Sequence, residues 1–106
     1  MEILIYIESK NYQKVSEKLL KDDAVSRISL AFKDAGNFDD SKTGYYCYIS
    51  GPDEVCRHAI SLLKSKEGEM EIELAKEVSG KEKQEVINKI KEEEERAIEG
   101  FGNILG

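Results

Sequence analysis

Apolar and polar residues alternate with a period of two in several short segments of the chain, and this alternation is typical of β-strands. Residues 25–33 and 70–76 show the pattern, and the largely apolar run at 45–50 is also read as a strand. Residues 1–8 are rich in β-branched side chains and are apolar on both faces. A strand that is apolar on both faces is expected at the centre of its sheet.

Apolar residues at helical spacing predict three helices, over about 10–21, 52–66 and 79–98. The third helix begins at Ser79, and Glu82 follows three residues later. This spacing has the form of a capping box, in which each side chain bonds the backbone N–H of the other residue.

The order of these elements predicts an α+β fold, a ferredoxin-like βαββαβ sandwich with an additional C-terminal helix. We expect residues 1–78 to form the ferredoxin-like domain. Residues 79–99 would form a helix that packs on the sheet or serves in a dimer, and residues 100–106 a flexible tail. The first and third strands would be central, with the first two helices on one face.

The opposite face of the predicted sheet is the surface most able to bind something. Its centre carries tyrosines, with a basic margin on one edge strand and an acidic margin on the other. The central residues are Leu4, Tyr6, Tyr46 and Tyr48, the basic margin is Arg27, Ser29 and Lys33, and the acidic margin is Glu71 and Glu73. An apolar surface of this size seldom stays bare on a monomer.

Three arrangements would cover or use this face. The C-terminal helix could fold back over it, or a homodimer could bury two such faces together, or bases of a nucleic acid could stack on the tyrosines. The helix offers an apolar stripe for the first arrangement, interrupted by Glu94. The residues of that stripe are Val86, Ile87, Ile90, Ala97, Ile98 and Phe101.

The run Tyr46-Cys47-Tyr48-Ile49 resembles the aromatic-x-aromatic-aliphatic centre of the third-strand signature of the RNA-recognition motif family. Tyr6 would take the aromatic position on the first strand. The resemblance implies single-stranded nucleic-acid binding at Tyr6, Tyr46 and Tyr48. It covers only these residues and the strand order. No basic residue directly precedes Gly44-Tyr45, Cys47 stands for a small residue, and Gly51 stands for a terminal aromatic.

Composition narrows the class of protein. Charged residues make up 36% of the 106 residues and the net charge is −6, which disfavours a phosphate backbone as partner unless basic residues cluster. The high lysine and glutamate content is typical of proteins from hot environments. No basic secretion signal or membrane-spanning apolar run is present, so we expect a cytoplasmic protein and no membrane partner.

The cysteines, the histidine and the oxygen-rich loop could carry chemistry, but the sequence predicts a structural role for each. Cys47 and Cys56 do not have zinc or disulfide-scaffold spacing and are expected to be reduced core thiols. The only histidine, His58, is expected on the solvent flank of its helix. The loop 34–44 carries several oxygen ligands but lacks the EF-hand pattern, so a solvated hairpin turn is expected rather than an ion site.

The sequence therefore predicts no catalytic residue, no metal site and no cofactor. We expect a small interaction or assembly module rather than an enzyme. It would act through the open sheet face or the C-terminal helix. Its partner would be a second copy or another protein. Nucleic-acid binding is the alternative, and the candidate binding residues for both are Tyr6, Tyr46, Tyr48, Arg27 and Lys33.

Overall fold

The computed structural model describes the backbone of residues 1–105, and the side chains of residues 1–65 and 68–95. Its elements follow the order β1 α1 β2 β3 α2 β4 β5 β6 α3, with three short 3-10 turns between them. The bounds are β1 Glu2–Ile7, α1 Tyr12–Lys21, β2 Ser29–Asp34, β3 Tyr45–Ser50, α2 Asp53–Ser61, β4 Lys64–Glu67, β5 Met70–Glu73, β6 Lys76–Val78 and α3 Gly80–Leu105.

Four strands form one antiparallel sheet in the order β2-β3-β1-β6. The two strands that are apolar on both faces, β1 and β3, occupy its centre, as predicted for the first and third strands. Strand β1 pairs with β3 along its whole length, from Glu2 opposite Ser50 to Ile7 opposite Tyr45. The α+β class is confirmed.

The simple βαββαβ order is not confirmed, because a separate hairpin of β4 and β5 is inserted before the last sheet strand. Residues 70–73, predicted to close the sheet, pair instead with residues 64–67, of which 64–66 were predicted to be helical. The edge of the sheet is the three-residue strand β6. Gly68 begins the two-residue turn with a φ of +66°, a conformation that glycine adopts without strain and that suits a tight hairpin.

The predicted second strand also begins later than expected. Residues 25–27 form a 3-10 turn and β2 starts at Ser29. Val25 is fully buried in this turn, so it serves the core without joining the sheet. The hairpin of β2 and β3 is confirmed, with Leu30 opposite Ile49 and Phe32 opposite Cys47.

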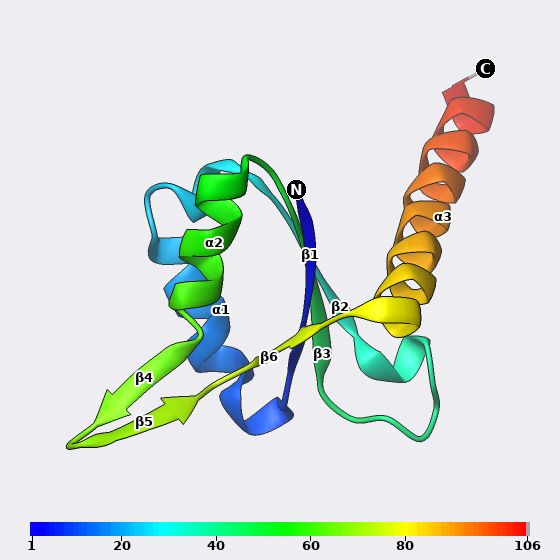
Figure 1. The fold of residues 1–106 in the computed structure, drawn as a ribbon. Helices are drawn as coiled ribbons and strands as arrows, with labels where there is room; N and C mark the ends of the chain where they lie inside the picture. The colour runs from blue at the N-terminus through cyan, green and yellow to red at the C-terminus, as the bar shows by residue number, and fades with distance from the viewer. Residues whose placement is uncertain (106) are drawn as a thin grey trace.

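Helices cover both faces of the sheet (Figure 1): α1 and α2 lie on one side and α3 lies on the other. Each face has its own buried cluster. On the side of α1 and α2 the buried side chains of the sheet are Ile3, Ile5, Ile7, Cys47 and Ile49. On the side of α3 they are Leu4, Tyr46, Tyr48 and Val78. The expected split of β1 and β3 between two faces is therefore confirmed.

Candidate functional site

The tyrosine-bearing face, expected to be the open surface, is covered by the first half of α3. Val86, Ile87 and Ile90 of that helix are buried against Leu4 and the tyrosines of β3. Only 1% of Tyr46 and 7% of Tyr48 is exposed. Of the arrangements that the sequence left open, the fold uses the intramolecular cover. The rest of the expected stripe, Ala97, Ile98 and Phe101, lies outside the described side chains.

A cluster of three polar groups joins the start of α3 to the sheet. The Tyr46 hydroxyl lies 2.9 Å from the Glu82 carboxylate of α3. The Lys42 ammonium, from the loop before β3, lies 2.7 Å from the same carboxylate oxygen and 2.8 Å from the Tyr46 hydroxyl. The carboxylate accepts from both groups, so its charge is compensated where the helix meets the sheet.

A second cluster repeats this arrangement further along α3 with the charges exchanged. The Tyr48 hydroxyl donates to the Glu2 carboxylate at 2.5 Å, and Lys91 of α3 donates to the same oxygen at 3.1 Å. Here the helix supplies the cation and the sheet supplies the anion. A third ion pair links Lys33 of β2 to Glu93 of α3 at 3.5 Å. These pairs specify which stretch of α3 lies over the sheet.

The titration of these groups follows from the contacts. The pKa of Glu82 is lowered, chiefly by the hydrogen bond from Lys42, and the pKa of Glu2 is lowered, chiefly by the hydrogen bond from Tyr48. Burial raises the pKa of Tyr46 and raises the pKa of Tyr48 to about 12. At neutral pH the tyrosines are therefore protonated donors and the glutamates are ionised acceptors.

The stability of the protein should consequently fall in acid. A carboxyl group with a lowered pKa stabilises the fold above its unfolded value near 4.5, and this contribution disappears as the pH falls through the lower folded value. We expect the double variant Glu2→Gln/Glu82→Gln to lose less stability than the unmodified protein between about pH 5 and pH 3. Urea unfolding midpoints across this range measure the difference.

Glu17→Gln, at an exposed position on α1, is the control. It should leave the dependence of the unfolding midpoint on pH unchanged. Equal slopes for the double variant and the unmodified protein would contradict the role of the two clusters.

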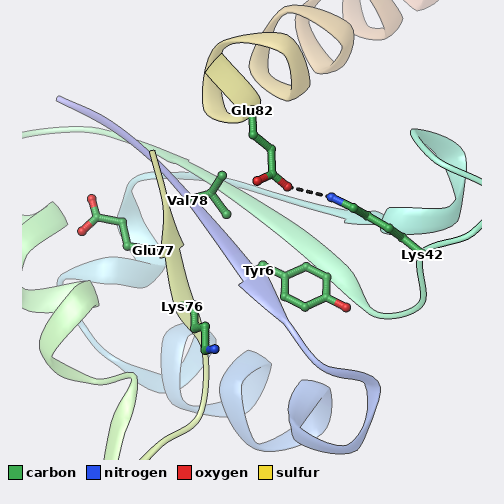
Figure 2. Close-up of a pocket in the computed structure, with 6 residues that line it drawn as sticks. All are labelled: Tyr6, Lys42, Lys76, Glu77, Val78 and Glu82. Carbon is green, nitrogen blue, oxygen red and sulfur yellow. Dashed lines mark hydrogen bonds and ion pairs between the residues drawn. The ribbon is translucent and has the colours of Figure 1, made fainter. Parts of the chain in front are cut away.

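A hollow of about 390 Å³ opens beside the first cluster, between β6, the loop before β3 and the start of α3. Figure 2 shows the Lys42–Glu82 pair above the Tyr6 ring, with Val78 beside the ring and Glu77 directed away from it. The Tyr6 hydroxyl donates to the backbone carbonyl of Thr43. Lys42 and Glu82, the charged groups that face each other here, are already paired, so this pair fastens α3 to the sheet.

The candidate binding residues are divided between different surroundings. Tyr6 is half-buried and lies edge-on to Tyr46, with ring centroids 5.6 Å apart. Arg27 lies outside the sheet in a 3-10 turn, so the expected basic margin does not form as a unit. Lys33 is on the expected face but pairs with Glu93. Tyr6, Tyr46 and Tyr48 do share one face, but α3 lies over the two tyrosines of β3.

The acidic margin also differs from its prediction. Glu71 and Glu73 lie on β5, in the hairpin with β4. There Glu73 is opposite Lys64 in the strand register. The expected edge of the sheet belongs instead to β6, which carries Lys76 and Glu77.

The cysteines are free and buried, as expected. Burial raises the pKa of Cys47 to about 12, which keeps this thiol protonated and unreactive. His58 is partly exposed on α2, but its Nε2 lies 2.6 Å from the carboxylate of Asp22. The same carboxylate accepts from the backbone N–H groups of Ala24 and Val25, and together these contacts hold the turn after α1 against α2.

The oxygen-rich loop directs its side chains back to its own backbone. Asp34 accepts from the N–H of Gly36 at 2.8 Å, and Asp39 accepts from the N–H and the hydroxyl of Ser41. Asx turns of this kind shape a loop without a bound ion. Among the residues whose side chains are described, no three acidic, cysteine or histidine groups are arranged to hold a metal ion.

Sequence reasoning missed the residues that fasten α3: Glu2, Lys42, Glu82 and Lys91. Only Glu82 had a signal, as the last member of the predicted capping box. Its carboxylate is directed to Lys42 and Tyr46. A partner 40 residues away in the chain leaves no local pattern to read.

Comparison of the chain with known protein families, with curated proteins and with solved structures found no match. Within residues 1–105, no helix is long and apolar enough to cross a membrane.

Proposed function

We propose that this chain is a non-enzymatic assembly module that binds a second copy of itself through the part of α3 that projects past the sheet. The observation that carries the proposal is the length of this helix. Its 26 residues correspond to about 39 Å at roughly 1.5 Å per residue. Among the side chains described for this helix, which end at Glu95, the last one in contact with the sheet is Glu93. Figure 1 places the end of α3 well beyond the sheet.

In proteins, most of the stability of a helix comes from the packing of its apolar face rather than from intrinsic propensity. A packing partner would therefore stabilise the part of α3 beyond Glu93. The sequence continues the apolar positions Ile87 and Ile90 with a spacing close to seven residues, at Ala97, Ile98, Phe101, Ile104 and Leu105. This repeat supports helix–helix packing as the contact.

Charge favours an antiparallel pair of helices. Glu94 interrupts the repeat at a position that would lie in the seam. In a parallel pair, two copies of Glu94 would face each other with their charges unpaired, which is costly. In an antiparallel pair centred near Ile98, each Glu94 lies opposite the glycine-containing end of the other helix, so the repulsion is avoided.

The proposal is tested by light scattering over a range of concentrations. Phe101→Glu is expected to weaken self-association roughly tenfold or more, because a carboxylate enters an apolar seam. Asn103→Glu adds the same charge outside the repeat and should change the association little. An average mass for Phe101→Glu that matches the unmodified protein at every concentration would refute the α3 contact.

The proposal also includes a fold type and a cellular location. The four-stranded antiparallel order with α1 and α2 on one face supports a ferredoxin-like sandwich with an inserted hairpin. The free buried cysteines suit a reducing, cytoplasmic location. The nucleic-acid alternative draws less support, because Tyr46 and Tyr48 lie under α3 and Lys33 is ion-paired.

A further inference from the structure

The outer edge of β2 is a second surface without a partner, and it lies far from the end of α3 in the chain. Strand β2 ends the sheet order and pairs with β3 on one side only. In the described part of the chain, no backbone hydrogen bond reaches Ser29–Asp34 from the outer side. A row of free N–H and C=O groups on an edge strand is a template for another strand.

The edge of β2 lacks two of the features that often prevent such pairing, a proline and a bulge. It keeps an unbroken register with β3 over all its residues, without proline or a bulge. Its lysine, Lys33, extends towards Glu93 of α3. Half-buried Leu30 and Phe32 add apolar area at the edge. The opposite edge, β6, has only three residues and is charged at Lys76 and Glu77.

We propose that β2 pairs antiparallel with β2 of a second copy, about a two-fold axis at Ala31. Side chains on one strand alternate between faces, so residues that face each other across the axis must both be even-numbered or both odd-numbered. A centre at Ala31 meets this condition and pairs Leu30 of one copy with Phe32 of the other. It also places Ser29 opposite Lys33, so no like charges face each other.

Other centres fit less well. A centre at Phe32 places Leu30 opposite Asp34, an apolar side chain against a carboxylate within the strand. A centre at Ala31 places Asp34 opposite Ile28, which lies before the first residue of β2. A centre at Leu30 runs the partner strand into residues 26–27, which belong to a 3-10 turn. At this register a second copy places an apolar side chain opposite an apolar one, Leu30 against Phe32, and no like charges face each other. On this ground the occupant we assign is a second copy of the chain, related by a two-fold axis. The product is one continuous sheet with both α3 helices on the same face.

This contact is independent of the one proposed for α3. Each of the two is a different two-fold contact, so a chain that uses both would join copies into a row. Association at β2 should therefore persist in Phe101→Glu, and the two proposals can fail separately.

Cysteine cross-linking tests the register directly. In the proposed pair, the two Ala31 Cβ atoms lie about 4.5–5.5 Å apart, close to the distance that a disulfide bridges. Ser29 of one copy faces Lys33 of the other, so the two Ser29 residues are separated by four residues along the strand, roughly 13 Å. Under mild oxidation, Ala31→Cys should form a covalent dimer at least tenfold faster than Ser29→Cys. The native cysteines are buried and should leave the unmodified protein monomeric on a denaturing gel.

The control variant, Ser29→Cys, is the one that random collisions would cross-link faster. Ser29 is exposed and Ala31 is half-buried, so random collisions would favour Ser29→Cys. Equal rates, a faster Ser29→Cys, or no cross-link with either variant would overturn the pairing.

A change of charge at Ser29 gives a second readout that does not depend on oxidation. Opposite Lys33, Ser29→Glu should tighten self-association and Ser29→Lys should weaken it, by roughly threefold to tenfold each, because the two-fold axis counts the pair twice. Sedimentation in the Phe101→Glu background isolates this contact from α3. Shifts in the same direction for both variants would contradict the register.

Discussion

Ile90→Ala is expected to lower the free energy of unfolding by about 3 kcal/mol. Ile90 is fully buried, in the cluster between α3 and the tyrosine face of the sheet. Shortening the side chain removes buried apolar contact and leaves a cavity that the two tyrosines and Leu4 can fill only in part. A loss of this size is a large share of the stability of a domain of this length.

Urea unfolding followed by far-UV circular dichroism measures the loss. Glu92→Ala, at an exposed position of the same helix, should change the stability by less than about 0.5 kcal/mol. If Ile90→Ala were as mild as Glu92→Ala, α3 would not be packed on the sheet. The Tyr46 and Tyr48 rings would then be available, and the nucleic-acid alternative would regain its main support.

Gly44→Ala is expected to cost about 3 kcal/mol, for a reason unrelated to buried apolar area. Gly44 has a φ of +93°, in the region that side chains other than glycine seldom adopt. A Cβ at this position would lie 2.6 Å from the carbonyl oxygen of Ile7 and 2.8 Å from the Tyr6 hydroxyl. The loop before β3 would have to move away from the end of β1.

The matched control is Gly68→Ala in the hairpin of β4 and β5. Gly68 also has a positive φ, +66°, but a Cβ there meets nothing within 4 Å. It should therefore cost only the conformational penalty, about 1 kcal/mol. Differential scanning calorimetry of the two variants separates strain from collision. Equal costs would show that the close approach at Gly44 does not restrain the loop.

The position of Gly44 also matters for the contact between α3 and the sheet. The loop that ends at Gly44 carries Lys42, which binds Glu82 and the Tyr46 hydroxyl. A displacement of the loop should weaken this cluster, so Gly44→Ala is expected to reduce the acid sensitivity that depends on Glu82. Two features with no common signal in the sequence are thus coupled through one loop.

The two polar clusters explain why α3 meets the sheet in one register. One cluster has its carboxylate on the helix at Glu82 and the other has its cation on the helix at Lys91. A shift of α3 along its axis would separate both pairs at once and leave the tyrosine hydroxyls without acceptors. Because the apolar contact of Val86, Ile87 and Ile90 is tolerant of small shifts, the polar clusters supply the specificity.

Several local predictions failed where the pattern was short or polar. Residues 64–67 continue a helix in composition, but they pair with residues 70–73 around the turn at Gly68. The stretch has no apolar period that separates helix from strand, and its partner decides its conformation. Residues 25–27 read as the start of a strand because of Val25, whose burial is instead achieved in a 3-10 turn.

The sequence by itself determined the α+β class, the central position of β1 and β3, and the separation of their side chains between two faces. These properties follow from periodicity within single segments, which the chain displays residue by residue. The tertiary structure alone decided that α3 covers the tyrosine face and that Lys42 meets Glu82. Each of these depends on which distant segments lie together, and the free energy of such contacts comes from packing and paired charges that no single segment contains.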